Sequence, residues 1–160
     1  MDLSLEEQLV NKLIEKNWHI SCAESCTGGL IASRIVNVAN ASKVFDASFV
    51  TYANEAKIKY LGVSPETIAA YGVVSEEVVF EMAAGLAKET GADVAIAVSG
   101  IAGPGGGTEK KPVGMVCFGF YINGSITTCI CRFGNPGRNE VRALSTEYAL
   151  QTMLELISEI

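Results

Sequence analysis

The sequence predicts one α/β domain in which a mixed sheet carries helices on both faces and includes an antiparallel hairpin. Along the 160 residues, apolar stripes at helical spacing alternate with short apolar runs of strand type, as expected when helices pack on a sheet. Residues 93–98 form a continuous apolar run, as central parallel strands do. Asn123 and Gly124 join two β-rich runs and give a strong hairpin signal. No repeat or linker interrupts this order, so the predicted domain spans residues 1–160.

Composition and charge restrict the class of protein. Hydrophobic residues make up 49% and charged residues 19%, which indicates a packed core rather than a disordered chain. The net charge of −6 disfavours nonspecific binding to nucleic acid, which needs a basic face. No apolar run reaches the roughly 20 residues of a membrane span, and the acidic N-terminus lacks the order of a signal peptide. We expect a cytoplasmic protein with neither nucleic acid nor membrane as partner, whose apolar content leaves room for a homo-oligomer.

The N-terminal segment begins with a capping box. Ser4 is followed three residues later by Glu7, and the apolar spacing beyond them predicts a helix over residues 4–16. Residues 19–23 have the composition of a short strand that would follow this helix.

A strand-to-helix turn at residues 23–29 has the sequence AESCTGG, with two hydroxyls, a thiol and two glycines. Loops at the carboxyl ends of strands line the ligand crevice of open α/β sheets. Residues 27–38 repeat with helical period, which places Gly28 and Gly29 in a first turn, where backbone N–H groups lack helical partners. The sequence therefore predicts a functional site at this turn.

Cap residues and turn residues predict the remaining elements. These are, in order, a strand over residues 47–52, a helix capped by Asn54 that ends near Gly62, a short helix from Ser64 and Pro65 to Tyr71, a helix from Ser75 to Lys88, the buried strand, a glycine-rich loop over residues 99–111, hairpin strands over residues 113–121 and 125–133, and a final helix opened by Asn135 and Pro136. The inward-facing side chains of the final helix are expected to be Val141, Leu144, Tyr148, Leu154 and Ile157.

Ser25 in the turn is a candidate nucleophile and needs a base. The single histidine, His19, would lie about 20 Å away if residues 19–25 are extended, so a neutral lysine is the remaining base. Lys57 follows a strand that ends at the same edge and falls at the third position of a helix, where the dipole and inward packing should lower its pKa. Tyr52 could hydrogen-bond the pair or donate a proton. The alternative is a solvated Lys57 and a core Tyr52.

Cysteine chemistry offers a competing interpretation of the same turn. Cys26 is a rival nucleophile without a histidine partner, and its alternative is a small packed thiol. A thiol-redox protein using Cys22 and Cys26 stays open and would need a low-pKa thiolate. Five cysteines, none in C-x2-C spacing, argue against a disulfide framework or a metal site, so we expect neither a metal nor another cofactor. Cys129 and Cys131 would share one strand face and pack in the core.

The glycine-rich loop suits an anionic ligand, because consecutive glycines can present N–H groups as a nest. Arg138 and Arg142 lie four residues apart in the first two turns of the final helix, where cations oppose the helix dipole unless an anion lies between them. The alternatives are an ordinary surface turn and pairing of the arginines with Glu140 or Glu147.

Five strings occur in order along the chain: AESCTGGLIASRI, FVTYANEAKIKYLGV, YGVVSEEV, SGIAGPGGG and KPVG. Together they closely resemble the CinA C-terminal domain family over about residues 5–158. The resemblance implies an α/β/α sandwich and, as in the stand-alone members that are nicotinamide-nucleotide amidohydrolases, metal-free hydrolysis of the carboxamide of nicotinamide mononucleotide to nicotinate mononucleotide and ammonia. The chain departs from the family pattern at Ala53, where serine is common.

The resemblance also implies a role for each matched residue. Ser25 would be the nucleophile, Lys57 its base and Tyr52 an assisting phenol. The choice of Lys57 over Lys59 rests on the resemblance and on helix phase. The oxyanion donors and substrate contacts would be Thr27, Gly28, Gly29, Gly100, Gly103, Gly105, Gly106, Arg138 and Arg142. A nucleotide-binding module of the same fold, without turnover, stays open as the alternative function.

Overall fold

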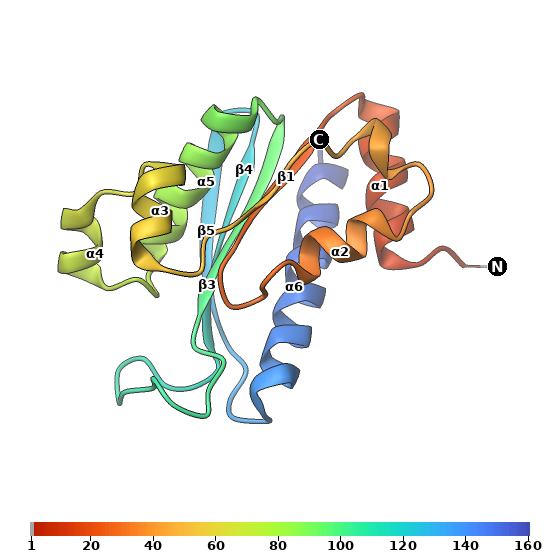
Figure 1. Cartoon of the computed structure of the whole chain (residues 1–160). Coiled ribbons are helices and arrows are strands. Elements are labelled where there is room, and N and C mark those ends of the chain that lie inside the picture. The colour runs from red at the N-terminus through yellow and green to blue at the C-terminus, as the bar shows by residue number, and fades with distance from the viewer. Residues whose placement is uncertain (1) are drawn as a thin grey trace.

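A mixed sheet lies between two layers of helices in the computed structural model, which describes residues 2–160 (Figure 1). The elements in chain order are α1 (Leu5–Lys16), β1 (Ile20–Glu24), α2 (Leu30–Val36), the short 3-10 helix η1 (Ala41–Lys43), β2 (Phe49–Val50), α3 (Asn54–Leu61), α4 (Pro65–Tyr71), α5 (Glu76–Thr90), β3 (Val94–Gly100), β4 (Met115–Ile122), β5 (Ser125–Arg132) and α6 (Arg138–Ser158). Met1, which the predicted domain includes, lies outside the described residues.

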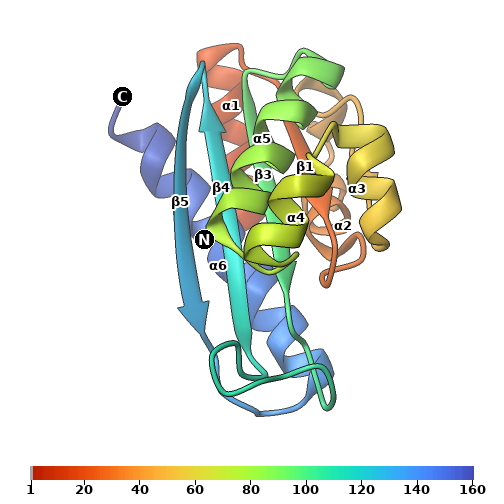
Figure 2. The same ribbon diagram turned by 90° about the vertical axis from the view of Figure 1, so that its left-hand side faces the viewer.

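The sheet has the strand order β2-β1-β3-β4-β5. β1 pairs in parallel with β2 and β3, whereas β3 with β4 and β4 with β5 pair antiparallel. Helices α1, α2 and α6 cover one face and α3, α4 and α5 the other (Figures 1 and 2). The predicted α/β/α sandwich with a mixed sheet and a hairpin is confirmed. Within residues 2–160, no helix is both long and apolar enough to cross a membrane.

Two local structures, the capping box of α1 and the hairpin turn, form as predicted. The N–H of Glu7 donates to Ser4 Oγ over 3.2 Å, and the N–H of Ser4 donates to Glu7 Oε2 over 2.8 Å, which completes the capping box. At the hairpin, Asn123 and Gly124 have φ values of 45° and 99°. These positive values are the ones a two-residue type I′ turn requires, so the turn residues set the β4–β5 register.

The strand predicted over residues 47–52 is much shorter than expected. Only Phe49–Val50 is strand, because the chain then leaves the sheet to begin α3. The carbonyl groups of Thr51 and Tyr52 both accept a hydrogen bond from Lys57 rather than from a strand. The carbonyls after β2 therefore bind the Lys57 amine, while the N–H of Thr51 still donates to the carbonyl of Glu24 in β1.

Two helices begin at other residues than predicted, α3 one residue earlier and α2 later. Ala53, not Asn54, is the N-cap of α3, so Lys57 occupies the fourth helical position instead of the third and still faces inward. Gly28 and Gly29 precede α2 with φ values of 57° and 101° rather than lying in its first turn. Glycine adopts these left-handed values without the steric cost that a side chain would add.

The inward face of α6 differs from the prediction at one turn. Leu144 is 36% exposed, whereas Ser145 and Thr146 are buried. Their hydroxyls donate to the carbonyls of Val141 and Arg142 one turn earlier, over 2.7 and 2.9 Å. Because these hydrogen bonds satisfy the hydroxyls, polar residues can take inward positions that a hydrophobic pattern assigns to leucine.

Close packing between α3 and α5 depends on Gly85. A Cβ atom at this position would overlap the carbonyl group of Leu61 at the end of α3. We expect Gly85→Ala to lower the free energy of unfolding by about 1–3 kcal/mol, although alanine is normally the better helix residue. Urea unfolding followed by circular dichroism measures this change.

Lys88→Ala, an exposed change on the same helix, is the control and should alter the free energy of unfolding by no more than about 0.5 kcal/mol. A Gly85→Ala protein more stable than the wild type would contradict the close approach of α3 to α5.

Candidate active site

The ends of three neighbouring strands meet at one cavity. Ser25 follows β1, Tyr52 lies just beyond β2, and Gly100 ends β3. Parallel strands place such ends at one edge of the sheet. The cavity has a volume of about 170 Å³. Its lining residues are Ser25, Cys26, Tyr52, Asn54, Lys57, Val73, Val74, Ser99 and Gly100. The structure therefore brings the three predicted catalytic residues to one cavity.

Lys57 is buried against Ser25, with only 1% of its surface exposed. Its Nζ lies 3.1 Å from Ser25 Oγ and donates to the carbonyl oxygens of Thr51 and Tyr52 over 2.7 and 3.2 Å. Burial lowers the pKa of Lys57 to about 8, because an ammonium loses solvation in the interior. The alternative of a solvated Lys57 is wrong.

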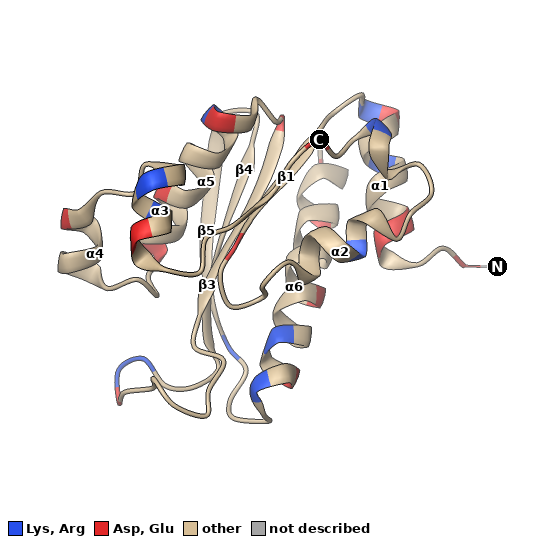
Figure 3. Cartoon of the chain, viewed as in Figure 1, with Lys and Arg blue, Asp and Glu red and all other residues tan. Residues whose placement is uncertain are grey.

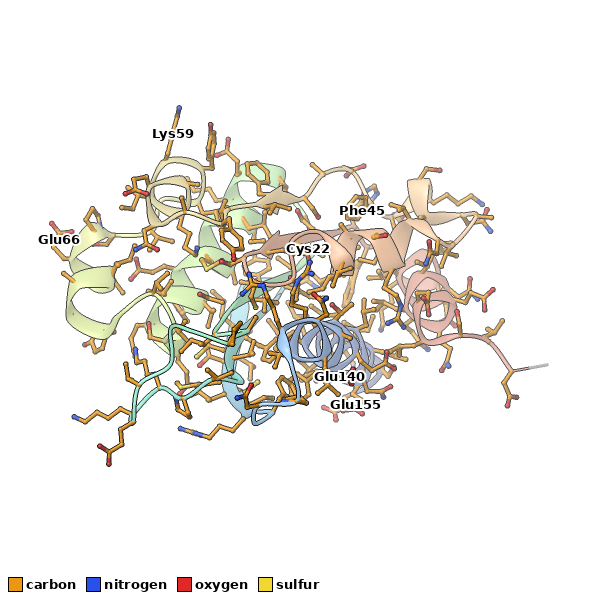
Figure 4. All side chains as sticks on the ribbon, turned by 60° about the horizontal axis from the view of Figure 1, so that its bottom comes forward. Cys22, Phe45, Lys59, Glu66, Glu140 and Glu155 are labelled. Carbon is orange, nitrogen blue, oxygen red and sulfur yellow. The ribbon has the colours of Figure 1, made fainter. Side chains whose placement is uncertain are left out.

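Lys59 is placed quite differently from Lys57. It extends outward from the surface of α3 (Figure 4), and its Nζ lies 5.2 Å from the ring centroid of the neighbouring Tyr60. Of these two lysines, only Lys57 contacts Ser25.

The acceptors around Lys57 suit both protonation states of its amine. An ammonium has three N–H donors and can donate to Ser25 and to both carbonyls. A neutral amine has two N–H donors and one lone pair. Since carbonyls can only accept, the two donors remain on Thr51 and Tyr52, and the lone pair faces the Ser25 hydroxyl. The neutral amine of Lys57 can therefore accept the hydroxyl proton of Ser25.

Glu24, directly before Ser25, is a buried carboxylate with no exposed surface. Its two oxygens accept the N–H groups of Gly29, Ile31 and Ala32 over 3.2, 3.0 and 3.0 Å. A carboxylate is stabilised at a helix N-terminus by these unpaired donors and by the helix dipole. Hydrophobic periodicity in the sequence did not identify Glu24 as a functional residue. The signal that could have identified it is an acidic residue shortly before the start of a helix.

The N–H groups of the turn are not all free. That of Gly28 donates to the carbonyl of Ser25 over 3.0 Å, and that of Gly29 is bonded to the carboxylate described above. The prediction that these two glycines offer free donors is therefore wrong. In the described part of the chain, the N–H groups of Cys26 and Thr27 have no hydrogen-bond acceptor.

Both cysteines near the turn are buried thiols. Burial raises the pKa of Cys26 to about 11 and raises that of Cys22, which lies in the interior (Figure 4). The low-pKa thiolate needed by a thiol-redox protein is absent at both positions. All five cysteines are free, and residues 2–160 contain no group of three or more Cys, His, Asp or Glu side chains that could hold a metal.

Tyr52 lies at the mouth of the site rather than in the core. Its side chain is 58% exposed, and its hydroxyl accepts a hydrogen bond from Arg138 Nη2 over 2.8 Å. Arg138 Nη1 donates to the carbonyl of Gly103 over 2.7 Å. The phenol makes no hydrogen bond to Ser25 or Lys57 in residues 2–160, so the backbone carbonyl of Tyr52, not its phenol, reaches the pair.

Arg142 contacts the turn that carries Ser25. Its Nε donates to the carbonyl of Cys26 over 2.9 Å and its Nη2 to the carbonyl of Thr27 over 3.3 Å. Basic residues lie in the first turns of α6 (Figure 3). Neither arginine pairs with Glu140 or Glu147 in the described chain, so that alternative is wrong.

The glycine-rich loop runs from the cavity to the surface. Gly100 lines the cavity, whereas Gly105 and Gly106 are exposed and lie outside its lining. Several backbone N–H groups of the loop have no acceptor among residues 2–160. They belong to Ala102, Gly103, Gly105, Gly106 and Gly107.

Sequence comparisons identify relatives over nearly the whole chain. The family model described as the CinA C-terminal domain matches residues 2–157. A CinA-like protein of Kosmotoga olearia is 51% identical over 147 residues, which cover 92% of this chain and 35% of that protein. The nicotinamide-nucleotide amidohydrolase PncC of Enterobacter agglomerans is 52% identical over 140 residues, covering 87% of this chain and 85% of that protein. The chain thus spans about a third of one relative and most of the other.

Solved structures share the fold. The competence damage-inducible protein A from Klebsiella pneumoniae superposes with a TM-score of 0.93 at 38% identity, covering 96% of this chain and 95% of that chain. The competence/damage inducible protein from Agrobacterium tumefaciens gives a TM-score of 0.89 at 40% identity, covering 98% and 99%.

The burial of Lys57 predicts a pH-dependent stability. An unfolded lysine keeps its proton up to about pH 10.4, whereas the folded pKa is about 8, so the unfolded state binds more protons between these values and stability rises with pH there. Relative to Lys57→Met, the wild type should gain roughly 2 kcal/mol between about pH 7 and pH 10. Urea unfolding at each pH measures this difference.

Lys59→Met removes an exposed lysine from the same helix and is the matched control. Its stability difference from the wild type should stay constant over this pH range. A constant difference for Lys57→Met as well would show that burial does not perturb Lys57.

Proposed function

The chain belongs to the CinA C-terminal domain family, and on this premise we propose that it hydrolyses the carboxamide of nicotinamide mononucleotide to nicotinate mononucleotide and ammonia. The observation that carries the proposal is the contact between buried Lys57 Nζ and Ser25 Oγ. The relative named nicotinamide-nucleotide amidohydrolase, at 52% identity, supports the substrate.

Ser25 and Lys57 would perform acyl transfer to water. Neutral Lys57 takes the hydroxyl proton, and Ser25 Oγ attacks the carboxamide carbon to form a tetrahedral oxyanion. Protonated Lys57 then donates to the amide nitrogen, the carbon–nitrogen bond breaks and ammonia leaves. Water, deprotonated by the same amine, attacks the ester and releases the carboxylic acid and Ser25. The pKa of about 8 suits both directions of transfer near neutral pH.

The N–H of Cys26 is the proposed oxyanion donor. It follows the nucleophile directly, as in other serine hydrolases, and Cys26 lines the cavity. Its N–H has no acceptor within residues 2–160. The N–H of Thr27 is similarly unpaired, but this residue has no exposed surface. Loss of one such donor typically costs about 3 kcal/mol in the barrier.

Nucleotide binding would use the cavity and the loop beyond it. The pyridine ring would pack against Val73 and Val74, two apolar residues of the cavity lining. The unpaired N–H groups of the glycine-rich loop, with Arg138, would hold ribose and phosphate. Tyr52 would keep Arg138 at the mouth through its hydroxyl instead of donating a proton. Cytoplasmic location and a homo-oligomer stay predictions.

Ammonia release from nicotinamide mononucleotide tests the proposal. Ser25→Ala removes the attacking oxygen and Lys57→Met removes its base, so each should lower the rate at least about 10³-fold. Ser42→Ala and Lys59→Met, two exposed changes, should keep the rate within about twofold of the wild type.

A nucleotide-binding module would give another pattern. Wild-type protein that binds nicotinamide mononucleotide in calorimetry but releases no ammonia at any pH tested would contradict the proposed hydrolysis. Such a protein would also bind equally well as Ser25→Ala or Lys57→Met.

A further inference from the structure

Arg142 joins α6 to the turn that carries Ser25, and the proposed mechanism gives it no role. Its Nε and Nη2 donate to the carbonyls of Cys26 and Thr27 over 2.9 and 3.3 Å. Its Nη1 donates to Asn139 Oδ1 over 3.2 Å, one turn earlier on the same helix. The guanidinium is thus oriented by its own helix and presents a fork of donors to two successive peptide groups.

These contacts fix the conformation of Cys26. The carbonyl of Ser25 accepts the N–H of Gly28 over 3.0 Å, which holds the peptide before Cys26. The carbonyl of Cys26 accepts from Arg142, which holds the peptide after it. A trans peptide is planar, with its N–H pointing opposite to its carbonyl. The N–H of Cys26 therefore points away from Gly28, and both flanking peptides resist its rotation.

A second side chain, that of Glu24, binds backbone groups of the same segment. Glu24 collects N–H groups at the start of α2, while Arg142 binds carbonyl groups. The guanidinium lies so close to the turn that a Cβ on Gly28 would lie 3.2 Å from Arg142 Nη2. Arg142 thus binds two carbonyl groups of the turn and Glu24 the N–H of Gly29, whereas the N–H groups of Cys26 and Thr27 have no acceptor among the described residues. Of these two residues, Cys26 lines the cavity.

We infer that Arg142 is a positioning residue, which holds the Cys26–Thr27 peptide so that the N–H of Cys26 stays aimed at the oxyanion formed beside Ser25. The inference rests on the proposed function. It replaces the phosphate contact expected for Arg142 from its sequence position, since three of its N–H donors are bonded within the chain. Arg138 alone of the two would then meet the phosphate.

A fluorophosphonate probe tests this role without the natural substrate. Ser25 Oγ attacks phosphorus, Lys57 takes the serine proton and fluoride leaves, so labelling needs the activated serine and the oxyanion donor but not the nucleotide. Intact-mass kinetics should show labelling about 100-fold slower in Arg142→Ala than in the wild type. Arg132→Ala, an exposed change at the end of β5, should label at the wild-type rate.

Chemical rescue separates positioning from a folding defect. Millimolar guanidinium should restore a large part of the labelling rate in Arg142→Ala and leave Ser25→Ala unlabelled, because the free ion can occupy the vacated donor position. Equal rates for Arg142→Ala and the wild type would overturn the inference. So would a wild type that the probe does not label, or a slow variant that guanidinium does not rescue.

Two substrates distinguish positioning from phosphate binding. For nicotinamide mononucleotide and for the same nucleoside without phosphate, Arg142→Ala should lower kcat about 100-fold and change KM less than about threefold. A KM increase confined to the phosphorylated substrate would overturn the inference and assign Arg142 to the phosphate. Labelling that depends on Arg142 in a protein that releases no ammonia would contradict only the proposed substrate.

Discussion

The rest of the site depends on one constraint, which is that the amine of Lys57 is buried away from solvent. Removing the Lys57 ammonium from water carries a large penalty, which lowers its pKa to about 8. Two carbonyls just beyond β2 and one hydroxyl beyond β1 are its only hydrogen-bond partners in residues 2–160. Because β2 ends at Val50, the carbonyls of Thr51 and Tyr52 accept from Lys57.

The turn after β1 must in addition hold Ser25 in one position. Left-handed glycines reverse the chain, Glu24 binds the donors at the start of α2, and Arg142 binds the carbonyl side from a distant helix. Buried backbone groups of proteins are nearly always paired, and in this turn the N–H groups of Cys26 and Thr27 are exceptions among the described residues. Of the two, only Cys26, next to the nucleophile, lines the cavity.

Sequence alone predicted the features that short-range chemistry determines. The capping box at Ser4, the Asn123–Gly124 turn and the inward phase of Lys57 need only neighbouring residues, and each is confirmed. The contacts of Arg142 depend on a tertiary partner, so periodicity could not find them. The Ser145 hydroxyl is satisfied by a carbonyl of its own helix, which a pattern of hydrophobic residues does not register. The glycines of the turn were misplaced because a helical stripe does not show where the first turn begins.

The central claim is that Lys57 loses its proton near neutral pH while in contact with Ser25. Isotope-edited NMR of the lysine side chains, with Lys57 assigned by its absence in Lys57→Met, measures this directly. The structure predicts a titration midpoint near pH 8 for Lys57. A midpoint close to about 10.4, the value of a solvated lysine, would contradict the account.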